Sequence, residues 1–290
     1  MDDNNPTTRF PSLIETNQHD DTFVHHLIDE SCQLRLLSLR CQEARDAELS
    51  CQDYALVVRR WDQASIAFCV SDGVGGSYRG DFAAHYLTQC LVDWLQALPD
   101  LSGNTQPMTK QLEKRLHHWA GVGQDELRRE ALPTGLPDLL REVLEEQRDQ
   151  HGSETVFFGG RIDYGSTFSD QRKRPVQAIF CWMGNVSAHI FMASNKYMLE
   201  GNEQGPESDK NRWSTLRGPR GELSVLTMVF DMVDRLIIHT DGLDPMSKEL
   251  ATLDDEALQA KAHELLRSPT NDDMTMLDLQ WSASAEILRT

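Results

Sequence analysis

The sequence contains no pair of cysteines spaced as Cys-x-x-Cys, although six cysteines occur in its 290 residues. Cys69 and Cys181 lie inside apolar runs, so we expect them to be small core residues. This cysteine usage is typical of a reducing cytoplasm and does not suggest a disulfide framework. We therefore expect a cytoplasmic protein.

The sequence also lacks a long apolar run, a basic leader and positive net charge. No apolar run approaches the roughly 18 residues that a membrane-spanning helix needs. Residues 1–6 contain no basic stretch followed by an apolar one, so we expect no signal peptide. The formal net charge of −18 argues against binding to nucleic acid and against adhesion to anionic membranes.

The amino-terminal segment is polar, and the pattern typical of a folded domain begins after it. We expect residues 1–36 to form a flexible tail in which residues 22–34 could form a short helix. Residues 37–290 are then expected to form one domain, of a length that a single large core can support.

Hydrophobic periodicity predicts strands and helices that are grouped along the chain and do not alternate strictly. We expect strands at 55–58, 65–70, 165–168, 176–183, 188–191, 223–228, 235–239 and 274–279. We expect helices at 81–98, 110–118, 124–131, 137–150 and 254–266, and a surface loop at 200–219. This grouping favours an α+β fold with layered sheets over a doubly wound parallel sheet.

Two apolar segments of strand length each end abruptly in Asp-Gly, at Asp72 and at Asp241. Further carboxylates lie at Asp53, before both motifs, and in the pair Asp272-Asp273, after them. Aspartate supplies a hard oxygen ligand, and glycine lets the backbone turn sharply and bring its carbonyl close to an ion. Because several carboxylates cannot stay ionised in one pocket without a cation, the sequence predicts a Mg²⁺ or Mn²⁺ site.

Five short motifs follow one another along the chain: Cys51–Ala55, Asp72–Gly76 with the following Gly80–Ala84, Gly165–Thr167, Thr240–Leu243 and Asn271–Thr275. Together and in this order, they resemble those of the PP2C-type (PPM) metal-dependent protein phosphatases, and of bacterial members in particular. The resemblance covers roughly residues 37–281. It implies a four-layer α+β fold, a β-sandwich of two antiparallel sheets flanked by α-helices.

The resemblance also implies a catalytic site with two Mg²⁺ or Mn²⁺ ions. Asp72 would bridge the ions, the Gly73 carbonyl would bind the first, and Asp241 and Asp272 would hold the second. Asp53 would act mainly through metal-bound water. Asp273 is the alternative to Asp272, although alignment to the motif favours Asp272. Oxygen-only ligands suit Mg²⁺ or Mn²⁺ better than Zn²⁺.

The expected function is hydrolysis of phosphoserine and phosphothreonine in proteins by a metal-activated water. The expected partners are a phosphoprotein substrate and a Ser/Thr kinase or its targets. The alternative is a weakly active or inactive relative that binds a phosphoprotein or a regulatory partner through the same cleft. The sequence contains no nucleophilic Asp-x-Asp after a strand, no G-x-S-x-G and no Walker A loop, so other hydrolase classes are not indicated.

Two departures from the family pattern support that alternative. Asn185 replaces an aspartate that binds a third metal in several relatives, which makes a third site doubtful here. Glu48 stands where many members have a phosphate-binding arginine. Arg45 is our candidate for that phosphate-binding role, and Arg40 is the other.

Overall fold

The computed structural model describes most of the chain and leaves out both ends and several internal segments. The described residues are 12–29, 32–60, 64–99, 101, 105–132, 134–164, 176–192, 195–199, 211–230, 233–268 and 271–281.

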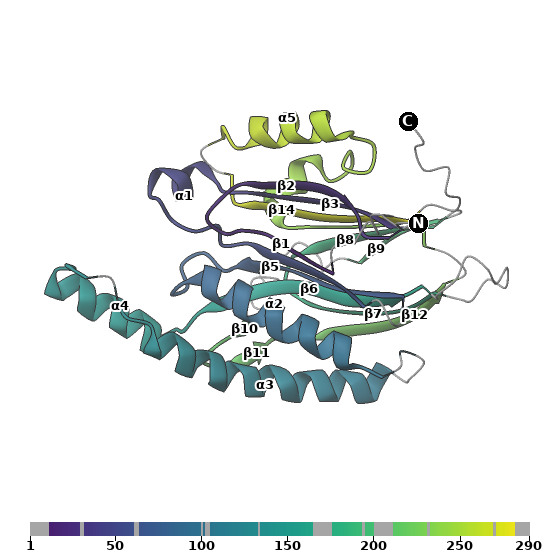
Figure 1. Cartoon of the computed structure of the whole chain (residues 1–290). Helices are drawn as coiled ribbons and strands as arrows, with labels where there is room; N and C mark the ends of the chain where they lie inside the picture. Colours follow the sequence, from purple (N-terminus) through teal and green to yellow (C-terminus); the bar gives the residue numbers. More distant parts are fainter. Residues whose placement is uncertain are drawn as a thin grey trace, which may run out of the picture.

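The described strands form two antiparallel sheets that face each other (Figure 1). The first sheet has eight strands: β1 (Leu13–Glu15), β4 (Tyr54–Arg60), β5 (Ser65–Gly73), β6 (Glu154–Asp163), β7 (Val176–Met183), β10 (Arg212–Ser214), β11 (Gly218–Arg220) and β12 (Ser224–Phe230). The second has six, in the order β2 (Thr22–Leu27), β3 (Cys32–Leu39), β14 (Met274–Trp281), β13 (Arg235–His239), β8 (Ser187–Met192) and β9 (Asn195–Leu199).

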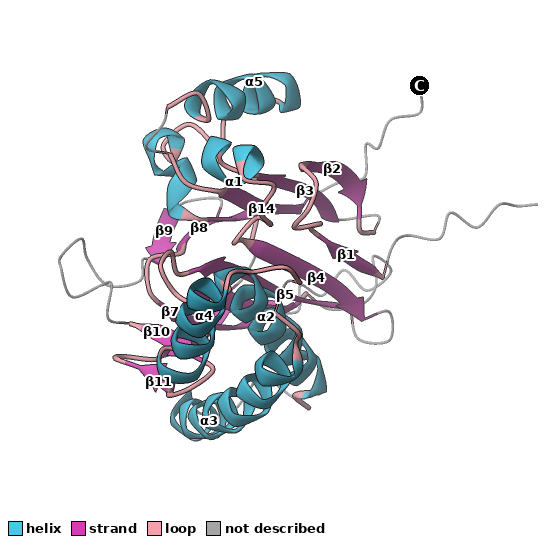
Figure 2. Cartoon of the chain, turned by 90° about the vertical axis from the view of Figure 1, so that its left-hand side faces the viewer, coloured by secondary structure: helices cyan, strands magenta, loops and turns pink. Residues whose placement is uncertain are grey.

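Helices cover the outer face of each sheet, which gives four layers (Figures 1 and 2). On the first sheet lie α2 (Gly80–Ala97) and α3 (Thr105–Arg129), and α4 (Asp138–Gln150) follows α3. On the second sheet lie the 3₁₀ helix η2 (Asp241–Met246) and α5 (Asp255–Leu265). A short helix, α1 (Gln42–Asp46), follows β3. The α+β sandwich expected from the resemblance is therefore confirmed.

The apolar core has one part between the sheets and one under each helical layer. The strand β5 shows why its sequence is continuously apolar: Ile66, Phe68 and Val70 face the other sheet, whereas Ala67 and Cys69 face the helices. Because successive side chains in a strand point to opposite faces, a strand buried on both sides has no polar alternation. The expectation that Cys69 and Cys181 are core residues is confirmed, since both are buried.

The amino-terminal prediction was wrong where the structure describes it. Residues 22–34 form no helix; strand β2 occupies residues 22–27 and β3 begins at Cys32. Strand β1 pairs with β4, and β2 pairs with β3, so residues from 13 onward belong to the sheets. Strand pairing between distant segments decided this outcome, and local periodicity does not report such pairing.

Other predictions differ from the structure in their boundaries. The two helices expected at 110–118 and 124–131 form one continuous helix, α3. The expected surface loop at 200–219 contains the short hairpin of β10 and β11, and its residues 200–210 lie outside the described part. The strand expected at 165–168 and the Gly165–Thr167 motif also lie outside the described residues. Strand β5 lies between β4 and β6 in the sheet, and β6 is a strand that we did not predict.

Candidate metal centre

Four carboxylates meet at one end of the sandwich, although they come from four separate segments. Asp53 immediately precedes β4, Asp72 lies near the end of β5, Asp241 follows β13, and Asp272 precedes β14. The strand ends that carry them are brought together because β13 pairs with β14 and β4 pairs with β5. The structure therefore brings together all four carboxylates that the sequence singled out.

The cluster makes each carboxyl group harder to ionise. Burial raises the pKa of Asp72 well above its usual value, and the charges of Asp241 and Asp272 add to the effect. Burial also raises the pKa of Asp53, with the Asp72 charge as the next cause. For Asp241, burial and the charge of Asp272 raise the pKa to about 6. Mutual repulsion of this kind is relieved when a cation enters the site.

The described part of the chain offers no side-chain cation to this cluster. Among the described residues, none of the four carboxylates forms an ion pair with lysine, arginine or histidine. The Oδ1 atom of Asp241 is buried and has no hydrogen-bond partner there, whereas its Oδ2 atom accepts a hydrogen bond from Asn185 Nδ2 at 2.9 Å. A buried carboxylate oxygen without a partner is costly, so the donor set fits a hard divalent cation.

The hydroxyl of Thr240 holds Asp53 in place. Thr240 Oγ1 donates a hydrogen bond of 2.8 Å to Asp53 Oδ2 and accepts one of 2.9 Å from the backbone N–H of Thr275. This contact lowers the pKa of Asp53 and so opposes part of the effect of burial. Thr240 therefore connects the Asp53 segment, β13 and β14, a role that the sequence motif did not reveal.

Gln18 is a second contributor that the sequence analysis missed. Its side-chain Nε2 lies 3.1 Å from the Cys51 carbonyl, 3.3 Å from the Asp53 carbonyl and 3.1 Å from the Asp81 carbonyl. Its backbone carbonyl accepts a hydrogen bond of 2.7 Å from Cys51 N. A lone glutamine in a polar segment gives no signal in a sequence, because its partners are distant backbone atoms.

The adjacent residues Asp272 and Asp273 have different environments. Asp273 is 3% exposed, and its two oxygens accept hydrogen bonds of 2.6 Å from the backbone N–H groups of Cys41 and Gln52. Asp272 is exposed, and its charge raises the pKa of Asp72 and of Asp241. Asp273 thus joins two backbone segments, which leaves Asp272 as the carboxylate available to an ion.

The thiol of Cys41 lies close to both of these aspartates. One ligand atom from each of the three residues falls within a group whose members are at most 4.8 Å apart. Burial raises the pKa of the Cys41 thiol to about 11. A thiol is a soft ligand, and Mg²⁺ and Mn²⁺ prefer the hard oxygens of the two aspartates.

The glycines of the two Asp-Gly motifs allow close backbone packing. A Cβ added at Gly73 would lie 2.9 Å from the Cα of Gly80 at the start of α2, and a Cβ at Gly242 would lie 3.0 Å from the Asp273 carbonyl carbon. Contacts this short would displace the backbone on which the aspartates sit. Glycine is therefore required at both positions for packing.

The candidate phosphate-binding arginine already has partners. Arg45 Nη2 lies 2.7 Å from Asp21 Oδ2, and its Nε donates a hydrogen bond of 2.8 Å to the Arg40 carbonyl. Arg40 Nη1 in turn donates to the Leu49 carbonyl at 3.3 Å. These contacts use only some of the N–H donors of each guanidinium, and Arg40 Nε has no hydrogen-bond partner among the described residues.

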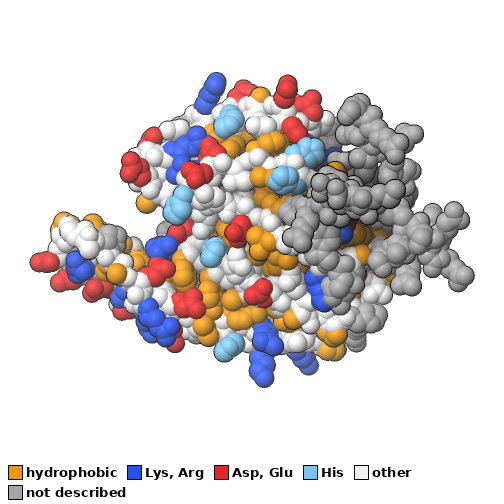
Figure 3. Space-filling view, in the orientation of Figure 1, with side chains coloured by type: hydrophobic (Ala, Val, Ile, Leu, Met, Phe, Trp, Pro, Cys, Tyr) orange, Lys and Arg blue, Asp and Glu red, His pale blue; other side chains and the backbone are white. Residues whose placement is uncertain are grey.

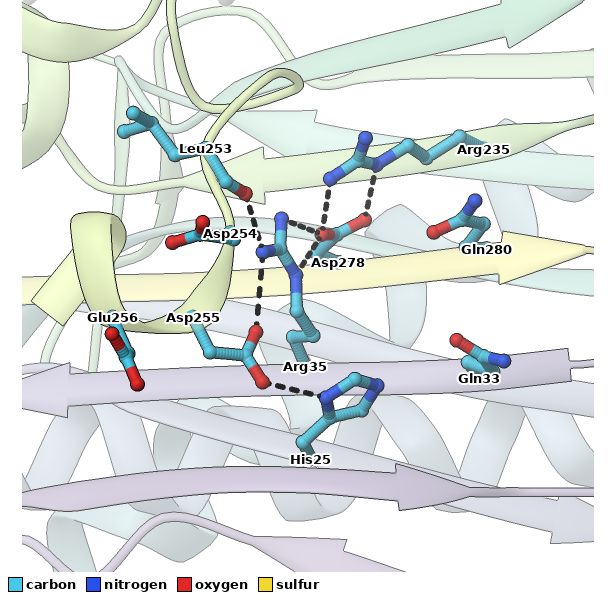
Figure 4. Close-up of a pocket in the computed structure, with 10 residues that line it drawn as sticks. All are labelled: His25, Gln33, Arg35, Arg235, Leu253, Asp254, Asp255, Glu256, Asp278 and Gln280. Carbon is cyan, nitrogen blue, oxygen red and sulfur yellow. Dashed lines mark hydrogen bonds and ion pairs between the residues drawn. The ribbon is translucent and has the colours of Figure 1, made fainter. Parts of the chain in front are cut away.

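A separate polar pocket lies on the outer face of the second sheet, beneath the start of α5 (Figure 4). Asp278 accepts a hydrogen bond of 2.7 Å from Arg35 Nε and one of 2.8 Å from Arg235 Nε. Arg35 also donates to the Leu253 carbonyl at 2.8 Å. These buried charges satisfy one another and attach the segment before α5 to the sheet, so we assign the pocket a structural role.

Comparisons with known proteins agree with this geometry. The profile of the family described as Protein phosphatase 2C matches residues 41–278. No sequence among the curated proteins is similar enough to this chain to count as a match. The fold resembles that of several solved structures, each at low sequence identity.

One is RsbX in complex with magnesium, with 14% identity, a TM-score of 0.53, and coverage of 90% of this chain and 100% of that one. Another is the serine/threonine phosphatase Stp1 from Staphylococcus aureus, with 12% identity, a TM-score of 0.52, and coverage of 85% and 94%. A third is the serine/threonine phosphatase of S. agalactiae, with 16% identity, a TM-score of 0.51, and coverage of 87% and 100%.

Within the described residues, no helix is long and apolar enough to cross a membrane.

At these identities the structural likeness establishes the fold, and the family match establishes the relationship. The match spans well over half of the chain and includes all four clustered carboxylates. The chain therefore belongs to the protein phosphatase 2C family and is a phosphoprotein phosphatase.

Proposed function

We propose that this protein is a metal-dependent protein serine/threonine phosphatase that uses two Mg²⁺ or Mn²⁺ ions. The observation that carries the proposal is the cluster of Asp53, Asp72, Asp241 and Asp272. Burial raises the pKa of all four, neighbouring carboxylates add to the effect, and no protein cation pairs with them among the described residues. Such a cluster is destabilising unless divalent ions neutralise it.

Each residue would hold the ions from its place in the fold. Asp72 would bridge both ions from β5, the Gly73 carbonyl would bind one, and Asp241 and Asp272 would hold the other. Asp53, buried beside Asp72, would act mainly through water. Bound ions of this kind supply positive charge for the phosphoryl oxygens and activate the attacking water.

The protein contributes positioning and charge. Thr240 and Gln18 fix the Asp53 segment, and Asp273 ties that segment to the start of α1. The phosphate-binding role of Arg45 stays a prediction, and Asp21 would compete with the phosphate for its guanidinium. The expected substrates are phosphoproteins, such as a Ser/Thr kinase or the proteins that it phosphorylates.

The test is hydrolysis of p-nitrophenyl phosphate and of a phosphothreonine peptide in Mn²⁺, in Mg²⁺ and in EDTA. We expect turnover in either metal, none in EDTA, and none for Asp72→Asn with an unchanged circular dichroism spectrum. Turnover that persists in excess EDTA, or in Asp72→Asn, would contradict the proposed chemistry.

A second candidate is a weakly active relative that binds a phosphoprotein through the same cleft. Asn185 favours it, because this amide already occupies one oxygen of Asp241. Isothermal titration with Mn²⁺ separates the two candidates. Metal binding without turnover of either substrate would favour the binding protein.

A further inference from the structure

The helix α4 packs weakly on the rest of the protein and exposes apolar side chains. None of its residues is buried. Leu139 is 75% exposed, Leu140 is 44% exposed and Val143 is 41% exposed. In Figures 1 and 3 this helix projects from the body beside α3, at the same end as α1.

The three apolar residues form one patch. Leu139 and Val143 are four positions apart, and Leu140 and Val143 are three apart, so all three lie on adjoining parts of one helical face. A helix of 13 residues is marginally stable in water when its apolar face has no partner. A molecule that covers this patch would therefore stabilise the helix.

The carboxyl end of α4 leads into residues 152–153, which contact the segment that follows Asp72. The Gly152 carbonyl accepts a hydrogen bond of 3.1 Å from Tyr78 N, and Ser153 Oγ accepts one of 3.1 Å from Ala83 N. These contacts attach the end of α4 to the segment that follows Asp72. At about 1.5 Å per residue, the helix extends roughly 20 Å from that point.

The size of the patch argues against a permanent partner. A stable interface between two copies buries about 1,200–2,000 Å² in total, which is more than three side chains on one short helix provide. A patch of this size suits a transient encounter, such as that between an enzyme and a protein substrate.

The charge of α4 indicates what the partner carries. The helix has five carboxylates and two guanidinium groups, for a net charge of −3. Arg148 is paired with the adjacent Asp149 at 3.3 Å. A complementary partner segment is therefore basic and carries apolar side chains.

We propose that α4 is a docking site for a basic, apolar segment of the phosphoprotein substrate, located outside the phosphorylated site itself. The proposal rests on the function proposed above, because it places the phosphate at the metal centre while the segment contacts α4. The two contacts together raise the effective concentration of the phosphate at the site.

The test uses two phosphothreonine peptides that share the same phosphorylated sequence. One carries in addition a Gly-Ser spacer of about 12 residues, with a root-mean-square length of about 20 Å, followed by an amphipathic Lys/Leu segment. For the wild type in Mn²⁺ we expect the added segment to lower KM about tenfold. In Leu140→Asp/Val143→Asp we expect this gain to disappear, while p-nitrophenyl phosphate hydrolysis stays within twofold.

Val229→Asp is the matched control, since Val229 is 66% exposed on β12, in the sheet and away from α4. This variant should keep the full gain. An equal KM for the two peptides in the wild type, or a gain that survives in the α4 variant, would overturn the docking proposal.

The outcome for p-nitrophenyl phosphate separates the two proposals. If the wild type does not hydrolyse it in Mn²⁺, the proposed function fails, and docking is then measured by fluorescence anisotropy of the same labelled long peptide. Weaker binding to the α4 variant than to Val229→Asp supports docking, and equal binding refutes it.

Discussion

Replacing Thr240 by valine tests how the hydroxyl supports the metal centre. Valine keeps the shape of threonine at a fully buried position but removes the hydrogen bond to Asp53 and strands the N–H of Thr275. The bond to a charged group contributes about 1.5–3 kcal/mol, and a stranded buried N–H costs about 1–3 kcal/mol. We expect a loss of about 3–5 kcal/mol, or a fall in Tm of roughly 6–15 °C.

The assay is thermal unfolding in Mn²⁺, followed by circular dichroism, together with the Mn²⁺ concentration that gives half-maximal activity. In the wild type, the hydrogen bond from Thr240 lowers the pKa of Asp53. Without this bond the carboxylate form of Asp53 is less stable, so the Mn²⁺ concentration for half-maximal activity should rise in Thr240→Val. Thr240→Ser is the matched control: it keeps the hydroxyl and removes one methyl, at about 1 kcal/mol. Equal stability of the valine and serine variants would refute the role assigned to the hydroxyl.

Three further predictions concern the same centre. In EDTA, the wild type should lose stability relative to Asp241→Asn as the pH rises from about 4 through about 6, because a carboxyl with a raised folded-state pKa stabilises the fold only while protonated. Urea unfolding across this pH range checks this prediction. Saturating Mn²⁺ should remove the difference in stability between the two proteins. Gly73→Ala should destabilise by about 1–3 kcal/mol and abolish turnover. Gly75→Ala, whose added Cβ meets no atom within 4 Å, should change stability by less than about 0.5 kcal/mol, so similar unfolding midpoints would contradict the packing argument. Asp273→Ala should cost about 2–6 kcal/mol in chemical unfolding, because two partly buried backbone N–H groups lose their acceptor. Asp272→Ala should keep the midpoint in EDTA and weaken Mn²⁺ binding by calorimetry.

Much of the fold could be predicted because its strands and helices have strong local patterns. The apolar runs of β5, β7 and β13 and the periodicity of α2 agree closely with the structure. The amino-terminal strands were missed because β2 and β3 mix polar and apolar residues, and their state depends on pairing with each other and with β14.

The candidate metal centre was also predicted only in part. The Asp-Gly pairs at Asp72 and Asp241 were recognised from sequence because both the acid and the glycine must lie at a strand end. The roles of Gln18 and Thr240 were not recognised, because their partners are residues far away in the chain. The separation of Asp273 from Asp272 likewise needed the positions of the Cys41 and Gln52 backbone.

The sequence by itself determined the fold class, the acidic charge and the residue types able to hold divalent ions, since these depend on composition and on short-range periodicity. Only the tertiary structure decided which carboxylates lie together, which aspartate accepts hydrogen bonds from the backbone, and that α4 projects from the body with exposed apolar side chains. The physical reason is that burial and mutual repulsion arise from contacts between distant segments, and no local pattern encodes them.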